Sequence, residues 1–355
     1  MNLRSRAVAV VLAVALLALL LLSGLRGSTT SFTPAEVRQG FAALLGLGEP
    51  LEPGRQLILE LLIRRTLVAA GVGAALAYSG ALLQGLFRNG LASPSILGIT
   101  SGASLGATLG IMVVGGYAGG IDLLDQAAKH SPLLVTIGGF LGAVSIAVLV
   151  TAIGGGAGRI SAPTLLLVGV AVNFCVAGIL MALQAWLVEN DWQLAEAVFH
   201  WSFGNLKDKS WTQVGMVWVG ALIAAGTIPF VSRELDLFGG GEEDAEALGV
   251  NTLRVKLVVL AAAALAASAA VAVAGQIAFV GLVVPHLVRL ITGPSHRSLL
   301  PLSLLAGAVF LLGTDVAQRL LLGRELFKPG VVMSLLGGPF FLMLLLQRRR
   351  EVRTW

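Results

Sequence analysis

The chain has 355 residues, of which 56% are hydrophobic and only 12% are charged. Soluble domains are about 25% charged, so this composition excludes a soluble protein, which could not cover its surface with polar groups. The net charge of +5 could indicate a nucleic-acid partner. The basic residues, however, lie in short gaps between apolar runs and at both ends, where they anchor membrane helices. We therefore expect an all-α polytopic membrane protein and no nucleic-acid partner.

The N-terminus begins with Arg4 and Arg6, followed by an apolar run from Ala7 to Leu22. The apolar core of a secretory signal has about 7–15 residues. This run reaches or exceeds that length, and no clear cleavage site follows it. We therefore predict a retained first membrane span over residues 7–25.

The rest of the chain continues the same pattern. A helix needs about 20 apolar residues to cross the hydrocarbon core. The sequence predicts ten spans in a single permease domain over 1–355, at 7–25, 66–86, 95–115, 133–153, 164–187, 211–231, 254–274, 278–293, 299–322 and 330–347. The eighth is short and contains Pro285, which predicts a partial or broken span. Ten spans place both termini on one side, and the arginines at both ends favour the cytoplasm.

Small residues recur at helical spacing in two of the predicted spans. Gly102, Gly106 and Gly110 share one face of the third span, and Gly138 and Gly142 share one face of the fourth. Such faces let helix backbones approach closely in a membrane. They predict a compact bundle and carry no information about substrate.

Two longer polar connections interrupt the apolar pattern. The first, at about 26–65, is expected outside the cell, and the second, at about 232–253, in the cytoplasm. In the second, glycines at 239–241 precede acidic residues at 242–244, which suit the positive N-terminus of a short helix. Gly249 follows where a helix stop is expected. The segment predicts a short helix that docks a soluble partner, and the alternative is a plain solvated turn.

We find no catalytic or metal-binding motif. There is no phosphate-binding loop, no H-E-x-x-H pair and no nucleophile elbow, and the single Cys175 lies in an apolar run. Transport must then draw on an ion gradient or on a separate ATPase. A gradient would require titratable groups in mid-membrane. The best candidates, Asp315 and Arg319, are one turn apart near the outer end of the ninth span and can pair with each other, which favours an external motor.

Four segments carry a family resemblance. They are Arg65 to Ser104, Gly241 to Val250, Gly275 to His286, and Gly330 to Phe341. In this order they resemble the permeases of iron-siderophore, haem and vitamin B12 ABC importers, and the likeness extends from about residue 60 to the end of the chain.

The resemblance implies the bundle of a type II ABC importer permease, with about ten helices per subunit. Its partners would be a second copy of the chain, two ATP-binding subunits, a soluble or lipid-anchored substrate-binding protein and membrane lipid. No cofactor is expected on this chain, because ATP and Mg would bind the partner subunit. The chain would lie in the bacterial cytoplasmic (inner) membrane and import an iron(III)-siderophore chelate, with haem or vitamin B12 as alternative cargo.

Residue roles also follow from the resemblance, which for the coupling segment agrees with the short docking helix predicted above. ATPase coupling would involve Gly241, Glu242, Glu243, Ala245, Leu248, Gly249 and Val250. Binding-protein docking would involve Arg65, Arg319 and Arg64, although Leu62-Ile-Arg-Arg65 lacks the first arginine of the usual Arg-Leu-Pro-Arg. The pathway would be lined by Gly169, Asn173, Gly178, Met333 and Ser334. The alternatives are simple anchoring at the membrane edge for Arg64 and Arg65, an internal pair with Asp315 for Arg319, and helix packing for the lining residues.

Two other classes of membrane protein are alternatives to an ABC importer permease. A gradient-driven secondary transporter would work without an ATPase, and it would need mid-membrane titratable groups that the sequence does not offer. A structural or signalling membrane protein would carry no cargo, and no separate soluble domain indicates one.

Overall fold

The structure is a computed structural model that describes residues 3–27, 30–117, 131–155, 162–322 and 327–352. Its secondary structure over these residues is helical. In chain order the helices are α1 (Leu3–Leu25), α2 (Pro34–Leu44), α3 (Pro53–Leu86), the 3-10 turn η1 (Pro94–Leu97), α4 (Ile99–Met112), the π turn η2 (Val113–Tyr117), α6 (Ser131–Gly154), α7 (Ala162–Asn190), α8 (Trp192–Ser202), α9 (Trp211–Ala225), α10 (Ile228–Phe238), α11 (Glu242–Ala247), α12 (Thr252–Ala274), α13 (Val280–Thr292), α14 (His296–Leu322) and α15 (Pro329–Val352).

The ten predicted spans coincide with helices. In the described chain, six helices are long and apolar enough to cross a membrane, and α9 with α10 makes a seventh, bent by 56°. Three shorter apolar helices, which include α4, α13 and most of α15, occupy the remaining predicted spans. The prediction of an all-α polytopic membrane protein is confirmed.

The predicted limits of the two connections were too wide. The first was expected to reach residue 65, but α3 already begins at Pro53, whose ring suits the first turn of a helix. Before it, Thr33 and Glu36 form a capping box that starts α2: the backbone N–H of Thr33 donates to Glu36 Oε2 (2.8 Å). The second connection also shrinks, because α10 runs to Phe238 and α12 begins at Thr252.

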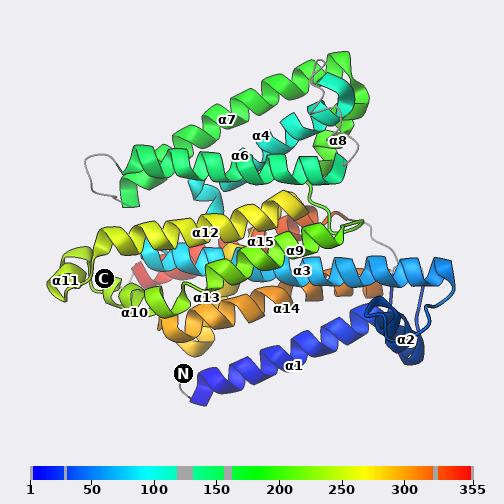
Figure 1. Cartoon of the computed structure of the whole chain (residues 1–355). Coiled ribbons are helices and arrows are strands. Elements are labelled where there is room, and N and C mark those ends of the chain that lie inside the picture. The colour runs from blue at the N-terminus through cyan, green and yellow to red at the C-terminus, as the bar shows by residue number, and fades with distance from the viewer. Residues whose placement is uncertain (1–2, 28–29, 118–130, 156–161, 323–326, 353–355) are drawn as a thin grey trace.

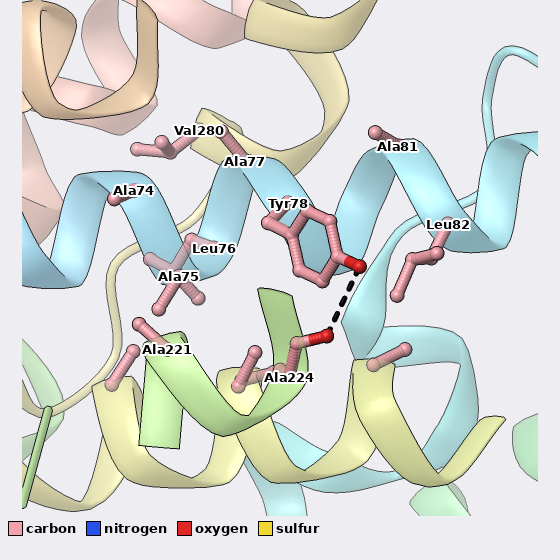
Figure 2. Packing of buried hydrophobic residues seen from close by; sticks show 14 of the residues in the cluster. Ala74, Ala75, Leu76, Ala77, Tyr78, Ala81, Leu82, Ala221, Ala224 and Val280 are labelled. Carbon is pink, nitrogen blue, oxygen red and sulfur yellow. Dashed lines mark hydrogen bonds between the residues drawn. The ribbon is translucent and has the colours of Figure 1, made fainter. Parts of the chain in front are cut away.

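Helix α3 is the centre of the bundle, and other helices surround it (Figure 1). In its most apolar stretch 94% of the residues are buried, against 17% in α7 and 6% in α1. Alanines next to Tyr78 let α9 approach α3 closely, and Figure 2 shows the tyrosine ring directed at Ala224. The Tyr78 hydroxyl lies 3.1 Å from the Ala224 carbonyl oxygen, so this buried polar group is satisfied by a helix backbone.

Glycine contacts set the distance between several helices. A Cβ on Gly80 of α3 would lie 1.7 Å from the carbonyl oxygen of Gly281 in α13, and one on Gly106 of α4 would lie 2.0 Å from that of Gly138 in α6. Neither position tolerates a side chain without movement of the backbone. The predicted glycine faces are therefore packing faces.

The predicted partial span is confirmed as α13, a helix of 13 residues. It follows a non-helical stretch that begins at Gly275 and ends at Phe279, both with positive φ. Non-helical backbone inside a membrane needs protein around it, and here the Gln276 side chain donates to Ser104 Oγ of α4 (2.6 Å). The break therefore lies against a neighbouring helix.

Candidate functional site

Different short helices lie at the two ends of the bundle (Figure 1). Helix α2 marks one end, which we call the α2 end. Helices α10 and α11 mark the other, the α11 end, and both chain termini lie toward it. This placement agrees with the expected even number of crossings.

The predicted coupling residues form one compact unit at the α11 end. Helix α11 ends in a hydrogen-bonded glycine stop, in which Gly249 N–H donates to Glu246 O (2.9 Å) and Val250 N–H donates to Ala245 O (3.0 Å). Gly249 has a φ of +85°, which favours glycine, and a Cβ there would meet nothing within 4 Å. Leu248 is 68% exposed. The turn therefore presents an apolar side chain from a fixed backbone.

Two polar contacts join α11 to the start of α12. Glu242 forms an ion pair with the amine of Lys256, and Thr252 Oγ1 donates to Glu246 Oε1 (2.7 Å). The two carboxylates are four residues apart on α11, and their two partners are four residues apart on α12. Since such residues share a helix face, the two helices present matching faces. We call these contacts the α11–α12 polar pairs.

A groove of about 670 Å³ lies between α10 and the turn that follows α11. Its lining includes Phe230, Leu237, Leu248 and Val250, together with Glu234. Phe230 is 72% exposed. Arg233 and Arg254 also line the groove, so the exposed tip of the predicted coupling segment belongs to a larger surface of mixed apolar and charged residues.

Helix α10 is tied to the start of α14 by Asp236. Its carboxylate accepts from the backbone N–H of His296 (2.7 Å) and from the hydroxyl of Ser295 (3.0 Å), and it also contacts His296 Nδ1 at 2.7 Å. A carboxylate at a helix N-terminus satisfies free N–H groups and complements the helix dipole. Gly85 of α3 leaves room for the imidazole, because a Cβ there would lie 2.4 Å from Nε2.

At the α2 end, the structure brings two of the three predicted docking arginines together on one carboxylate. Nε of Arg65 in α3 donates to both oxygens of Asp315, at 3.2 and 3.1 Å, and its Nη2 is paired with Oδ1. Nη2 of Arg319 lies 3.0 Å from Asp315 Oδ2. The predicted pairing of Asp315 with Arg319 is confirmed, and all three residues are buried.

The guanidinium of Arg319 also reaches the end of α1. Its Nη1 donates to the Arg26 carbonyl (2.8 Å) and its Nη2 to Ser23 Oγ (2.7 Å). The Thr66 hydroxyl donates to Leu62 O (2.7 Å), so in its 2.5 Å contact with Thr66 the Ser23 hydroxyl is the donor. Three helices, α1, α3 and α14, thus meet in one polar network.

The third predicted docking residue, Arg64, lies outside this network. Its Nη2 is 3.5 Å from Glu60 Oε1, and the same carboxylate oxygen accepts from the indole N–H of Trp211 (2.9 Å). A cavity of about 110 Å³ adjoins Arg65 and Asp315, and Lys207 and Met333 also line it. The α2 end is therefore rich in charge and carries a small hollow.

The predicted pathway residues have different surroundings. Gly169 is a packing position, because a Cβ there would lie 1.9 Å from Ile96 O. The Asn173 amide donates to Ser95 O (3.0 Å) and accepts from the Ser101 hydroxyl (2.6 Å), so it ties α7 to the break before α4.

The other three differ in exposure. Gly178 and Ser334 are exposed, whereas Met333 is buried. A Cβ on Gly178 would meet nothing within 4 Å. Within the described part of the chain, the five predicted pathway residues do not line one common cavity.

Sequence reasoning missed several members of these groups. Ser23 and Thr66 look like ordinary small polar residues within or beside apolar runs, and nothing in their spacing indicates a partner. Lys256 did carry a signal, since a cation within a predicted span is itself a sign of function. Its partner Glu242 was predicted as a coupling residue, but the pairing was not.

The chain is similar in sequence to known transport proteins. The model of the FecCD transport family matches residues 11–347. A cobalamin import system permease of Halobacterium salinarum is 38% identical, covering 88% of this chain and 79% of its own. A hemin transport system permease of Yersinia pestis is 37% identical (82% and 84%). An Fe(3+) dicitrate transport system permease of Escherichia coli is 34% identical (90% and 91%).

A solved structure gives the same result for the fold. It is described as an inward-facing conformation of a metal-chelate type ABC transporter, and it superposes with a TM-score of 0.77 at 26% identity, covering 95% of this chain and 97% of its own. A match over nearly the whole length leaves no large part of the fold unaccounted for. The chain therefore belongs to the FecCD transport family and is a multi-pass permease subunit of an ABC importer.

Proposed function

We propose that this permease carries an iron(III)-siderophore chelate into the cytoplasm, driven by ATP hydrolysis on separate subunits. Haem or vitamin B12 is the alternative cargo, because the relatives' names include hemin and cobalamin beside Fe(3+) dicitrate. The observation that carries the proposal is the coupling unit at the α11 end, where Leu248 projects from a fixed turn. An external motor needs such a rigid, exposed contact.

The proposal assigns the α11 end to the cytoplasm. Both termini lie there, and both carry arginines, which favour the cytoplasmic side. Two ATP-binding subunits would then bind beneath a pair of permeases and hold ATP and Mg, and this chain would bind neither. The whole chain, 1–355, would act as a single permease domain of the bacterial cytoplasmic membrane.

A second copy of the chain is the proposed partner within the membrane. Exposed apolar residues follow α7 at seven-residue intervals: Leu167 is 75% exposed, Phe174 is 74% and Met181 is 73%. Leu335 and Leu342 of α15 show the same interval, and each is 61% exposed. A stripe of this period suits a helix–helix seam. Gly178 and Ser334, two of the residues proposed to line the pathway, lie on these same helices.

We propose that the substrate-binding protein docks at the α2 end, through Arg64, Arg65 and Arg319. Arginine suits this role because its rigid guanidinium binds carboxylates through paired hydrogen bonds. Arg65 and Arg319 already hold Asp315, so their docking would require an exchange of partners. Arg64→Glu is the cleaner test because it leaves that network intact. It should weaken binding-protein affinity at least tenfold in a pull-down titration, and unchanged affinity would reject docking through Arg64.

The cargo is tested by uptake in a deletion strain complemented with this permease. Radiolabelled ferric siderophores of the hydroxamate, catecholate and citrate classes are compared with haem and cobalamin. Accumulation of a ferric siderophore alone supports the proposal. Accumulation of haem or cobalamin alone transfers the assignment to that cargo within the same family.

A further inference from the structure

Helix α11 is held differently by its two neighbours in the chain. On the α10 side it is preceded by Gly239, Gly240 and Gly241, and Gly241 has a φ of +140°. The N–H groups of these glycines donate to the last carbonyls of α10, at 3.2, 3.2 and 3.1 Å, but none of the three has a side chain that could fasten α11 to α10. The α12 side begins with the hydrogen-bonded stop at Gly249, and the two polar pairs then fasten the helices side by side.

The polar pairs matter because α11 has only six residues. A helix of this length is not stable by itself and needs tertiary contacts. Ala245 is fully buried, and the side chains of Glu242 and Glu246, on the same face, reach Lys256 and Thr252 of α12. Within the described residues, α12 is the helix to which the side chains of α11 form hydrogen bonds and ion pairs. A displacement of α11 therefore moves the start of α12 with it.

Lys256 is the unusual member of this group. It is 7% exposed, and burying a lysine amine is unfavourable unless the charge is paired. Its partner Glu242 retains a half-exposed side chain. A buried cation at the start of an apolar helix therefore receives its counter-charge from the coupling segment.

Helix α12 in turn contacts much of the bundle. The Ser79 hydroxyl of α3 donates to Ala263 O (2.7 Å). A Cβ on Gly220 of α9 would lie 2.6 Å from Ala269 Cβ, and one on Gly139 of α6 would lie 3.5 Å from Ala272 Cα. Since these contacts are close and lie on three sides, a shift of α12 must displace α3, α6 or α9.

We infer that the α11–α12 polar pairs transmit movement of the coupling segment into the membrane through α12, and that Lys256 is the principal positioning residue. The inference rests on the proposed coupling to a separate ATPase. The coupling residues suggested by the family resemblance end at Val250 and include neither Thr252 nor Lys256. On the other side of α11, three glycines without side chains lead to α10, and Asp236 fastens α10 to α14.

The test uses the complete complex, with permease, ATPase and binding protein, in proteoliposomes. The quantity measured is cargo imported per ATP hydrolysed. Lys256→Met, which keeps the length of the side chain, and Glu242→Gln should each lower this ratio at least fivefold while ATP hydrolysis continues. The double variant should be no worse than either single variant, because both remove the same interaction. Thr252→Val should have a smaller effect of the same kind.

Arg297→Gln is the matched control. Arg297 is an exposed cation at the start of α14, at the same end of the bundle, and its side chain has no ion pair within the described residues. Its ratio should equal that of the wild type. An unchanged ratio in Lys256→Met, an equal loss in Arg297→Gln, or additive losses in the double variant would each overturn the inference.

Two further outcomes are distinguishable. If Lys256→Met does not assemble with the ATPase on size-exclusion chromatography, Glu242→Gln decides by the same ratio, because it alters a half-exposed carboxylate and leaves Lys256 in place. If Leu248→Asp also leaves the ratio unchanged, the proposed coupling segment itself is wrong. If Leu248→Asp uncouples and the Lys256 and Glu242 variants do not, the proposed function stands and the inference about α12 fails.

Discussion

The guanidinium of Arg65 lies on the carboxylate of Asp315, a residue 250 positions later in the chain, with Nε 3.1 Å from Oδ2. The pair joins α3, the most buried helix of the bundle, to α14 at the α2 end. Because Arg319 shares the same carboxylate and also holds the end of α1, one acidic residue compensates two buried cations.

Asp315→Asn should therefore destabilise the protein strongly. Removal of one partner from a buried ion pair leaves uncompensated charge and typically costs about 3 kcal/mol or more. The measurement is thermal unfolding in detergent, followed by tryptophan fluorescence or by aggregation. Glu36→Gln is the control, since it removes the exposed pair of Glu36 with Arg55 at 2.7 Å. Equal melting temperatures for wild type and Asp315→Asn would contradict the structural role of the network.

Gly80→Ala should disrupt the packing of α3 on α13. The added Cβ would lie 1.7 Å from the Gly281 carbonyl oxygen, and overpacking of this kind costs about 2 kcal/mol or more. Gly178→Ala is the comparison, because a Cβ there meets nothing within 4 Å and alanine favours a helix by up to about 1 kcal/mol. Expression and melting temperature check both variants. The helix contact is refuted if Gly80→Ala is as stable as Gly178→Ala.

Lys209, in the connection between α8 and α9, should make stability depend on pH. Burial lowers its pKa to about 8, and nearby Lys328 acts in the same direction while Asp208 opposes them. An unfolded lysine has a pKa of about 10.4. Between these two values the unfolded chain binds more protons than the folded one, so stability rises with pH from about 8 to about 10 and the penalty is fully present below 8.

Lys209→Gln should remove this dependence. The measurement is the melting temperature from pH 7 to pH 10 for the variant and the wild type in parallel, so that other titrating groups cancel. The difference should be greatest near neutral pH, where the variant is the more stable, and should shrink as the pH rises. A difference that is independent of pH would show that the Lys209 amine titrates normally in the folded protein.

Leu248→Asp should separate hydrolysis from transport. The substitution places a charge on the exposed tip of the coupling segment without entering the buried side of α11, where Ala245 lies. Uptake should fall at least tenfold while the permease folds and inserts normally, and Leu248→Met should retain most of it. ATPase activity stimulated by the binding protein is measured alongside. Normal uptake in the Asp variant would mean that the ATPase does not contact this turn.

Composition and hydropathy were sufficient to predict the ten spans, because lipid demands long apolar segments with internally satisfied backbones. They did not predict α2 and α8, which lie in the connections between spans. Even the partial span at 278–293 was recognisable from its length and Pro285. The start of α3 was missed because Arg55, Glu60 and Arg64 make its first three turns polar. These turns lie beyond the apolar stretch, so hydropathy alone could not assign them to the helix.

A polar contact could be predicted only where both residues lie on one helix, because their spacing in the sequence then determines whether they share a face. Asp315 and Arg319 are four residues apart, and their pairing was expected and found. Arg65 meets the same carboxylate through the packing of α3 against α14, and the spacing of residues along one helix does not encode that packing. The partners of Ser23 and Lys256 also lie on other helices, so the packing of the helices, and not sequence spacing, brings them together. The docking and pathway residues came from resemblance, and the coupling helix from resemblance and local sequence signals together. Both indicate positions but not the contacts that the side chains make.

The proposed function requires that this permease has no motor of its own. The decisive measurement is cargo uptake into proteoliposomes that contain this chain alone, compared with those that also contain its ATPase and binding protein, with ATP and with an imposed proton or sodium gradient. We expect uptake only in the complete complex with ATP, and none with the gradient alone. Gradient-driven uptake by the isolated chain would contradict the account.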